Sequence, residues 1–319
     1  MIYPITIPTN SDLRSFNFFI VEDSKGLTLI DAGINHEACW QQFLQTLQCH
    51  QFLLEDINEI ILTHSHEDHI GLIPRIIEKH NIPVYVHAEA IPRLKREKSF
   101  FEQRTSFYER LYREMGCGTE GEQRVQQLKN IVIEKQNEGL RADYRTLSEN
   151  DYIINRKVIE TPGHAPDHIA LIDERNNVML GGDHLIAHIS SNALIEPYMN
   201  GERRKTVLEY VESLQKCLTY DIDYCYSGHG ERITAPHLLI HKRLKGIERK
   251  AEKFLSYISE EEKTASALAQ HFYPDKYYTQ FSLVMSEVIG HLDYLEEKNK
   301  VEKGMENGVW RYKTVKHIK

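Results

Sequence analysis

The apolar run Ile60-Ile61-Leu62 leads directly into Thr63-His64-Ser65-His66-Glu67-Asp68-His69. The run predicts a buried strand, and a loop that follows a strand is a frequent place for a functional site because the sheet holds its ends. Three histidines and one aspartate fall within six residues here, and such groups are costly to bury unpaired. Imidazole and carboxylate ligands suit Zn²⁺, and also Fe or Mn. The motif therefore predicts a metal site.

Three later motifs also place a histidine or an aspartate directly after an apolar strand. They are Thr161-Pro162-Gly163-His164, Gly181-Gly182-Asp183-His184 and Ser227-Gly228-His229-Gly230. Their glycines allow the backbone to approach closely. One such motif alone would be weak evidence, but in combination with the first they predict four loops that meet at one site.

The order of these motifs resembles the metallo-β-lactamase superfamily. Asp31-Ala32-Gly33 comes first, His64-x-His66-x-Asp68-His69 follows, and the last positions are His164, Asp183 and His229. The resemblance covers residues 12–235. It implies an α/β fold, the αββα sandwich, in which two mixed β-sheets face each other with helices outside.

The resemblance also implies a centre of two divalent metal ions. Zinc is expected, with iron or manganese as alternatives. The first ion would be held by His64, His66 and His164, the second by Asp68, His69 and His229, and both by Asp183. Asp31 would orient the ligand loop without contacting a metal.

Two metals that share a water lower its pKa to about 7 and supply hydroxide at neutral pH. We expect this bridging hydroxide to cleave an ester, thioester or lactone bond of a small molecule. Asp68 would position the hydroxide as well as bind metal. His184, next to Asp183, is a second catalytic candidate, for which packing without a chemical role is an equal alternative.

Within the superfamily, the pattern looks closer to the glyoxalase II-like branch than to the secreted zinc β-lactamases. The N-terminus Met1-Ile2-Tyr3-Pro4-Ile5 lacks the features of a secretion signal. In the commonest class of those enzymes, a cysteine stands where this chain has Asp183. A glyoxalase II-like enzyme would cleave thioesters, lactones and other small esters.

We predict two domains, a hydrolase domain over residues 1–240 and a C-terminal domain over 241–319. The first contains a helical insertion at about 92–146, rich in charged residues with aromatic residues at helical spacing. The second contains two helical patterns, 265–271 and 281–297, and a hairpin pattern at 301–312. This is the outline of a winged helix, and it resembles the lactamase-beta-like branch of the superfamily. Either the insertion or the C-terminal domain is a candidate surface for homo-oligomers.

Three alternatives remain open at this stage. Members of the lactamase-beta-like branch include endoribonucleases, so a metal-dependent nuclease or phosphodiesterase is one. The expected second helix of the tail carries Glu287, Asp293 and Glu296, however, and acidic residues oppose binding to phosphate backbones. A mononuclear iron persulfide dioxygenase, using only His64, His164 and Asp183, is another. The third is a non-catalytic ligand sensor with a DNA-binding tail.

The bulk composition limits the partners and the compartment. The net charge is −8 over 319 residues, which argues against a surface built throughout for nucleic acid or anionic membrane. No segment approaches the roughly 20 apolar residues that span a bilayer. The five cysteines form no C-x-x-C pair, which is typical of reduced thiols. We therefore expect a cytoplasmic protein with a small-molecule substrate.

Overall fold

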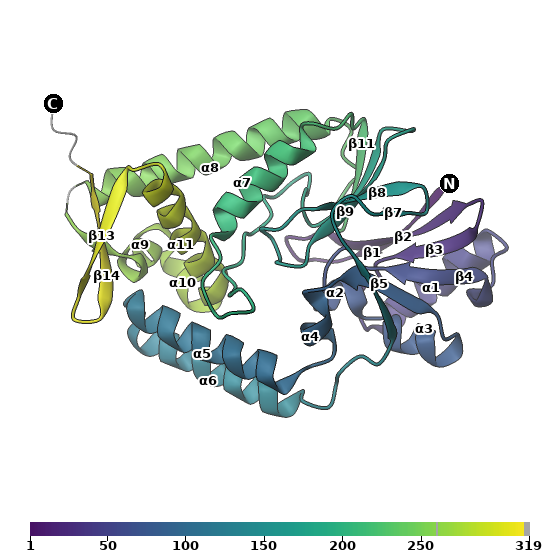
Figure 1. Cartoon of the computed structure of the whole chain (residues 1–319), viewed down its shortest axis with the longest axis horizontal. Helices are drawn as coiled ribbons and strands as arrows, with labels where there is room; N and C mark the ends of the chain where they lie inside the picture. The colour runs from purple at the N-terminus through teal and green to yellow at the C-terminus, as the bar shows by residue number, and fades with distance from the viewer. Residues whose placement is uncertain (260, 316–319) are drawn as a thin grey trace. The chain divides into compact units, whose positions relative to one another are not determined.

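The computed structural model describes residues 1–259 and 261–315 (Figure 1). The chain forms two compact units. The first unit consists of Met1–Lys95, Glu138–Ser191 and Ser213–Ile240, and the second of Arg96–Asn137, Asn192–Glu212 and His241–Lys319. Each unit is therefore assembled from three separated segments of the chain.

The first unit contains a six-stranded mixed sheet in the order β1-β2-β3-β4-β5-β6. Strands β1 to β3 are antiparallel neighbours, and β3 to β6 run parallel. The strands are β1 (Ile2–Pro8), β2 (Ser15–Asp23), β3 (Gly26–Ile30), β4 (Ile57–Ile61), β5 (Pro83–His87) and β6 (Asp143–Leu147). The connecting helices are α1 (Glu37–Cys49), η1 (Leu54–Asp56), α2 (Glu67–Ile70), α3 (Ile73–Lys79) and α4 (Ala90–Leu94).

Alternating side chains of this sheet enter two different cores. Phe18 and Ile20 of β2 pack in a cluster with Phe43 of α1 and Ile76 of α3, so these helices cover one face of the sheet (Figure 1). The intervening side chains of β2, Phe19 and Val21, belong to a second cluster. This alternation follows from the two-residue period of a strand.

The second cluster lies between two facing sheets. It joins Phe19 and Ile61 to Val158, Leu171 and Leu180 of the other sheet, which has the order β11-β10-β9-β8-β7. Its strands are β7 (Tyr152–Ile153), β8 (Arg156–Glu160), β9 (Ile169–Asp173), β10 (Val178–Gly182) and β11 (Tyr224–Ser227). Since β10 and β11 are parallel and the other pairs antiparallel, this sheet is also mixed.

The second unit is helical and ends in a small antiparallel sheet. Its elements are α5 (Lys98–Glu114), α6 (Gly118–Glu134), α9 (Ala265–Phe272), α10 (Pro274–Thr279), α11 (Phe281–Glu297), β12 (Lys263–Thr264), β13 (Val301–Glu306) and β14 (Val309–Thr314). The sheet has the order β12-β14-β13. Helices α7 (Thr206–Cys217) and α8 (Pro236–Ile258) contribute residues to both units.

The predicted helical insertion needs one correction. Its last residues are not helical, because Asp143–Leu147 forms β6 and pairs in parallel with β5. This strand lies at the edge of its sheet, and three of its five residues are exposed. Its sequence pattern therefore resembles that of the polar helices before it.

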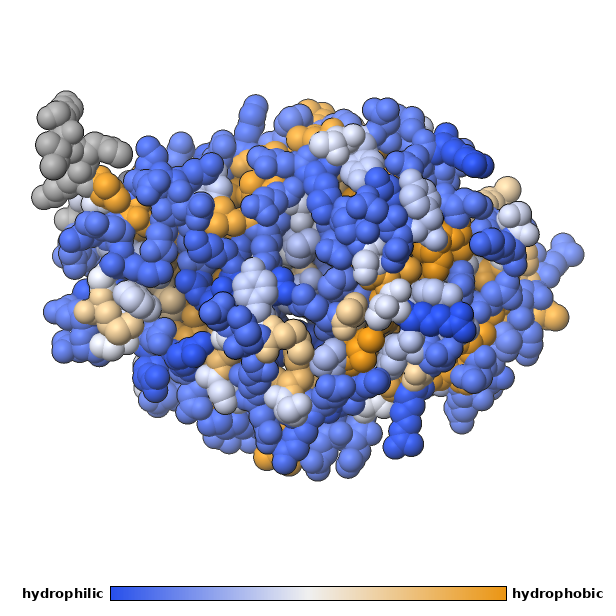
Figure 2. All heavy atoms as spheres, in the orientation of Figure 1, coloured by the Kyte–Doolittle hydropathy of each residue, from blue (hydrophilic) through white to orange (hydrophobic). Residues whose placement is uncertain are grey.

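The exposed surface in Figure 2 is mostly hydrophilic, in agreement with the 27% of charged residues in the sequence. On the face drawn in Figure 2, hydrophilic residues predominate and apolar ones form scattered patches. Among the residues that the structure describes, no helix is both long and apolar enough to cross a membrane.

Candidate metal centre

The four motifs lie in the first unit, where each follows the carboxyl end of a strand. His64 follows β4, His164 follows β8, Asp183 follows β10, and His229 follows β11. Parallel pairing places β10 and β11 side by side with the same direction, so Asp183 and His229 emerge at the same edge. The sheets thus place the ends of separated loops close together.

All seven predicted ligands are brought together in small groups. In each group, one donor atom of every member lies within 4.8 Å of the others. The groups are His64, His66 and His164; His64, His69 and Asp183; and Asp68, His69 and His229. Members shared between groups make the seven side chains one continuous cluster.

In the first group, three ring nitrogens converge. His66 Nδ1 lies 3.0 Å from His64 Nε2 and 3.0 Å from His164 Nε2. The outer nitrogens of the other two rings have partners of their own: His64 Nδ1 lies 3.1 Å from Thr63 Oγ1, and His164 Nδ1 lies 3.0 Å from Ser191 Oγ. Three nitrogens that face one point are the donor set of a metal site.

Asp183 connects the groups. Its Oδ2 lies 3.0 Å from His229 Nε2 and 3.6 Å from His164 Nε2. Its Oδ1 lies 3.4 Å from His69 Nε2, but this contact lacks hydrogen-bond geometry, and within the described residues both atoms are buried without a hydrogen-bond partner. Such atoms are costly to bury unless a ligand satisfies them, so a cation fits this cluster.

Asp31 supports the cluster from behind. Its carboxylate accepts hydrogen bonds from Thr63 N at 2.7 Å and Thr63 Oγ1 at 2.8 Å, and its Oδ2 lies 2.9 Å from His69 Nδ1. The residue has a left-handed backbone with φ 59°, a strained conformation that tertiary contacts hold in place.

These contacts set the tautomers of the rings. His69 Nδ1 donates to Asp31, and His229 Nδ1 donates to the carbonyl oxygen of Ser15 at 2.8 Å. Because Thr63 Oγ1 uses its proton on Asp31, it accepts from His64 Nδ1. Once Nε2 gives up any proton it carries, each of these rings directs an Nε2 lone pair at the cluster, which is the form that binds a metal.

Burial and neighbouring charges adjust the protonation of the cluster. Burial holds the pKa of His64 and of His66 well below the ordinary value. Burial also acts on His69, but the charges of Asp183 and Asp31 outweigh it and raise its pKa. Burial alone would raise the pKa of Asp183, whereas His69 and His229 hold it well below the ordinary range.

The remaining predicted residue, His184, lies apart from the three ligand groups. It is fully buried, and its Nε2 lies 3.4 Å from Cys217 Sγ. Burial lowers the pKa of His184 to about 3, so the ring is neutral near pH 7. A catalytic role for His184 stays a prediction.

Sequence reasoning missed Asp167 and His168, which contact the ligand loops directly. Asp167 Oδ2 accepts a hydrogen bond from Ser65 N at 2.8 Å, and His168 Nε2 accepts one from Asp183 N at 3.1 Å. The available signal is a second histidine four residues after His164. It is easily overlooked, because the residues around it also have the pattern of a strand.

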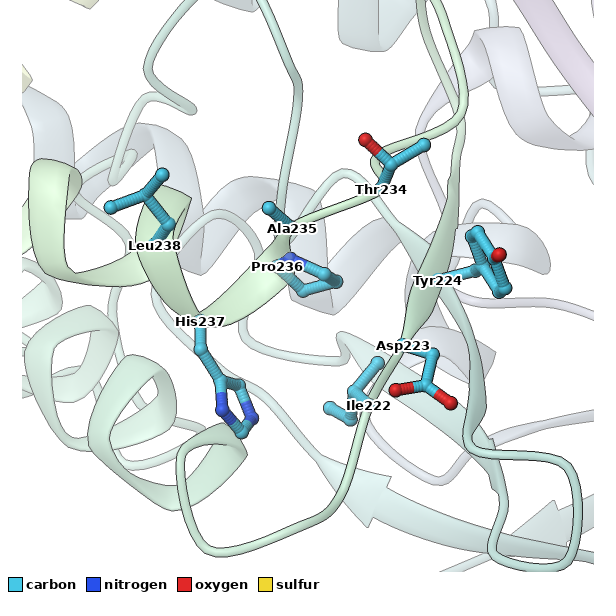
Figure 3. A pocket seen from close by; sticks show the side chains of 8 residues that line it. All are labelled: Ile222, Asp223, Tyr224, Thr234, Ala235, Pro236, His237 and Leu238. Carbon is cyan, nitrogen blue, oxygen red and sulfur yellow. The ribbon is translucent and has the colours of Figure 1, made fainter.

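A hollow elsewhere in the first unit contains none of the predicted ligands (Figure 3). It has a volume of about 330 Å³. Its lining residues are Ile222, Asp223, Tyr224, Thr234, Ala235, Pro236, His237 and Leu238. In this hollow, His237 Nε2 lies 2.9 Å from the carbonyl oxygen of Tyr220 and donates to it.

The sequence of the first unit matches a known family model. Residues 12–229 match the model of the Metallo-beta-lactamase superfamily. The chain belongs to this superfamily. The match includes all seven clustered side chains and Asp31.

The chain is also similar to proteins over nearly its full length. It is 30% identical over 313 residues to the probable metallo-hydrolase YqjP of Bacillus subtilis, covering 98% of this chain and 97% of that protein. A metallo-beta-lactamase family protein from Thermus thermophilus has a TM-score of 0.78 at 23% identity, with 98% of each chain covered. A beta-lactamase domain protein from Burkholderia ambifaria has a TM-score of 0.80 at 19% identity, covering 98% and 92%.

These findings confirm the predicted fold class, including the helical C-terminal region with its small antiparallel sheet. With the His/Asp cluster, they identify the protein as a probable metallo-hydrolase of the superfamily.

Proposed function

We propose that this chain uses two divalent metal ions, with zinc expected, to hydrolyse an ester, thioester or lactone bond of a small molecule. This chemistry is that of the glyoxalase II-like branch of the superfamily, which the sequence pattern resembles. The observation that carries the proposal is the donor set: seven buried or half-buried side chains in overlapping groups.

The size of the donor set favours two metals over one. The mononuclear iron alternative needs only His64, His164 and Asp183. Here Asp68, His69 and His229 form a further group of three, and Asp183 lies within 3.6 Å of both His164 and His229. A carboxylate between two groups of ligands supports a shared, bridging role.

Metal ions held there would acidify water and polarise the carbonyl oxygen of a substrate. Within the protein, the carboxylates differ in exposure: the Asp68 side chain is 25% exposed and that of Asp183 is 6%. Asp68 is therefore the carboxylate that can orient a water molecule and take its proton. Asp183 and the histidine rings, whose positions are fixed by hydrogen bonds, would hold the metal ions in place.

Burial of α11 favours a small substrate over nucleic acid. Twelve of its 17 residues are buried, whereas a reading helix must expose one face to a DNA groove. Its acidic residues already have partners in the second unit: Glu287 pairs with Lys250, Asp293 with Arg203, and Glu297 with Lys205. The helix is thus part of the interior of its unit.

The test is a panel of thioester, lactone and phosphodiester substrates with zinc-loaded enzyme, supported by elemental analysis. We expect hydrolysis of a thioester or lactone, and an Asp183→Asn variant slower by more than about 100-fold, beyond the usual cost of losing an outer partner of a ligand. Asp173→Asn is the matched control, because Asp173 is a buried carboxylate of the same unit that pairs with Arg156.

Three results would contradict the proposal. One is full activity of Asp183→Asn, which would place the reaction elsewhere. Another is a single iron per chain as purified, which would favour the dioxygenase. The third is a preference for the phosphodiester, which would favour the nuclease or phosphodiesterase alternative.

A further inference from the structure

The segment 161–169 contacts two other ligand-bearing loops at once. It carries His164 itself. Ile169 N donates to the carbonyl oxygen of Thr63 at 2.8 Å, next to His64. Asp167 and His168, in the middle, reach the loop of His64 and His66 and the loop of Asp183. A single short segment therefore connects loops from both sheets.

His168 holds the backbone of Asp183. Its Nε2 accepts the Asp183 N–H at 3.1 Å, and its Nδ1 lies 2.7 Å from Thr161 Oγ1. A backbone N–H can only donate, so Nε2 must carry the lone pair and Nδ1 the proton. Thr161, fully buried, accepts that proton and fixes the tautomer. Both ring nitrogens are then used, and neither is left to bind a metal.

The residue before Asp183 is pressed against this ring. Gly182 has φ +47°, and a Cβ there would lie 2.6 Å from Thr63 Oγ1 and 2.9 Å from His168 Nε2. Thr63 is itself tied to Asp31. The Gly182–Asp183 backbone thus lies between two fixed side chains, and a shift of His168 would move the carboxylate that connects the ligand groups.

Asp167 performs the same function for the first motif. Its Oδ2 accepts the N–H of Ser65, the residue between His64 and His66, at 2.8 Å. Asp167 is buried, with 3% of its surface exposed. This hydrogen bond has a charged acceptor, which makes it one of the stronger kind.

We propose that Asp167 and His168 are a pair of positioning residues that set the separation between the His64–His66 loop and Asp183. The pair acts through backbone N–H groups and not by binding metal or substrate. This inference rests on the proposed metal centre, but not on its substrate.

Each residue offers a matched pair of variants. In His168→Gln, the side-chain oxygen occupies nearly the place of Nε2 and can still accept from Asp183 N. In His168→Asn the side chain is too short to do so. Asp167→Asn likewise keeps an acceptor for Ser65 N, and Asp167→Ala removes it.

The experiment measures Zn²⁺ affinity by competition with a chromophoric chelator, and the visible absorption spectrum of the Co²⁺-loaded protein. We expect His168→Asn and Asp167→Ala to bind Zn²⁺ about 10–100-fold more weakly and to change the Co²⁺ spectrum. His168→Gln and Asp167→Asn should restore most of the affinity, to within about threefold by the same reasoning. Thermal unfolding of the metal-free variants shows whether each is folded.

Wild-type affinity and an unchanged Co²⁺ spectrum in His168→Asn and Asp167→Ala would overturn the proposal. It would also fail if the conservative variants lost as much affinity as the others, because the hydrogen bonds would then not be the cause. If His168→Asn does not fold, Thr161→Val, which removes only the partner of Nδ1, should still weaken Zn²⁺ binding several-fold, and wild-type affinity there would count against us.

The readout separates the two proposals. A wild-type protein that binds Zn²⁺ but cleaves none of the substrates would contradict the proposed hydrolysis and leave the positioning pair standing.

Discussion

The two units both bury charged side chains, but they leave them in different situations. In the first unit, the histidines and Asp183 point their donor atoms at one another, and within the described residues two of these atoms have no hydrogen-bond partner. In the second unit, Glu196 is bound by Arg104 through two hydrogen bonds of 2.7 and 2.5 Å. Possible metal-ligand atoms converge in the cluster of the first unit, whereas opposite charges pair at Arg104 and Glu196 in the second unit.

This difference separates a binding site from a structural ion pair. Buried polar groups need partners. Where the protein supplies them, as for Arg104, the attraction of Glu196 outweighs burial and raises the pKa of the guanidinium. Where buried atoms are left without a hydrogen-bond partner, as His69 Nε2 and Asp183 Oδ1 are, a ligand can supply one. Burial alone would not distinguish the two.

Removal of metal should have the largest effect, and it tests whether the His/Asp cluster of the first unit is a metal site. We expect dialysis against a strong chelator to abolish hydrolysis and to lower the melting temperature, because ions that bind only the native state stabilise it. Added Zn²⁺ should restore both. Calorimetry with and without metal checks this. If protein that elemental analysis shows to be metal-free kept its full turnover, the cluster would not be the site of a metal needed for hydrolysis.

Removal of one partner of the Arg104–Glu196 pair tests whether this pair of the second unit is a structural ion pair. Glu196→Ala leaves a buried guanidinium without its carboxylate, which costs roughly 3–5 kcal/mol of unfolding free energy. The double variant Arg104→Met, Glu196→Leu should recover most of this loss, since an apolar pair can replace a buried ion pair. Urea unfolding measures both. Zn²⁺ affinity should not change, and a large drop would show that these charges serve the metal centre.

The smallest expected effect concerns Asp173, a buried carboxylate of the first unit that already has partners. Burial alone would raise the pKa of Asp173, but hydrogen bonds from Asn176 and the charge of Arg156 outweigh it and lower the pKa. Its stabilising contribution is therefore present above the unfolded-state pKa of about 3.9 and is lost as the pH falls through the lower, folded-state value.

We accordingly expect Asp173→Asn to cost about 1 kcal/mol at pH 7 and to flatten the loss of stability below about pH 4. The urea midpoint as a function of pH measures this effect. Full Zn²⁺ binding in the variant would show that the partners of a buried carboxylate, and not its unit, decide its role. An acid limb identical to that of the wild type would contradict the assigned contribution.

In the six-stranded sheet, the central strands could be predicted from sequence, and the edge strands β1 and β6 could not. Strands β2, β3 and β4 have apolar residues that enter the two cores, so their patterns are strong. Strand β1 lies at the edge of its sheet and contains Pro4 and Pro8. Proline is tolerated there because one side of an edge strand donates no ladder hydrogen bond. Its presence nevertheless hides the residue pattern that usually predicts a strand.

The residues of the candidate metal centre also divide into some that the sequence predicts and others that it does not. His64, His66 and Asp183 are visible in the sequence because metal binding demands particular side chains at strand ends. Asp167 and His168 are not, because their partners are backbone N–H groups of Ser65 and Asp183, which any residue provides. Nor could the sequence show that residues 96–137, 192–212 and 241–319 share one unit.

That three-segment composition affects the order of events during synthesis. The face of α5 and α6 that Tyr112 and Arg124 use to meet Phe281 and Ser282 of α11 leaves the ribosome long before α11 exists. At about 5–20 residues per second, the delay is on the order of ten to thirty seconds. For that interval the α5–α6 hairpin lacks the helix that Tyr112 and Arg124 contact in the finished unit.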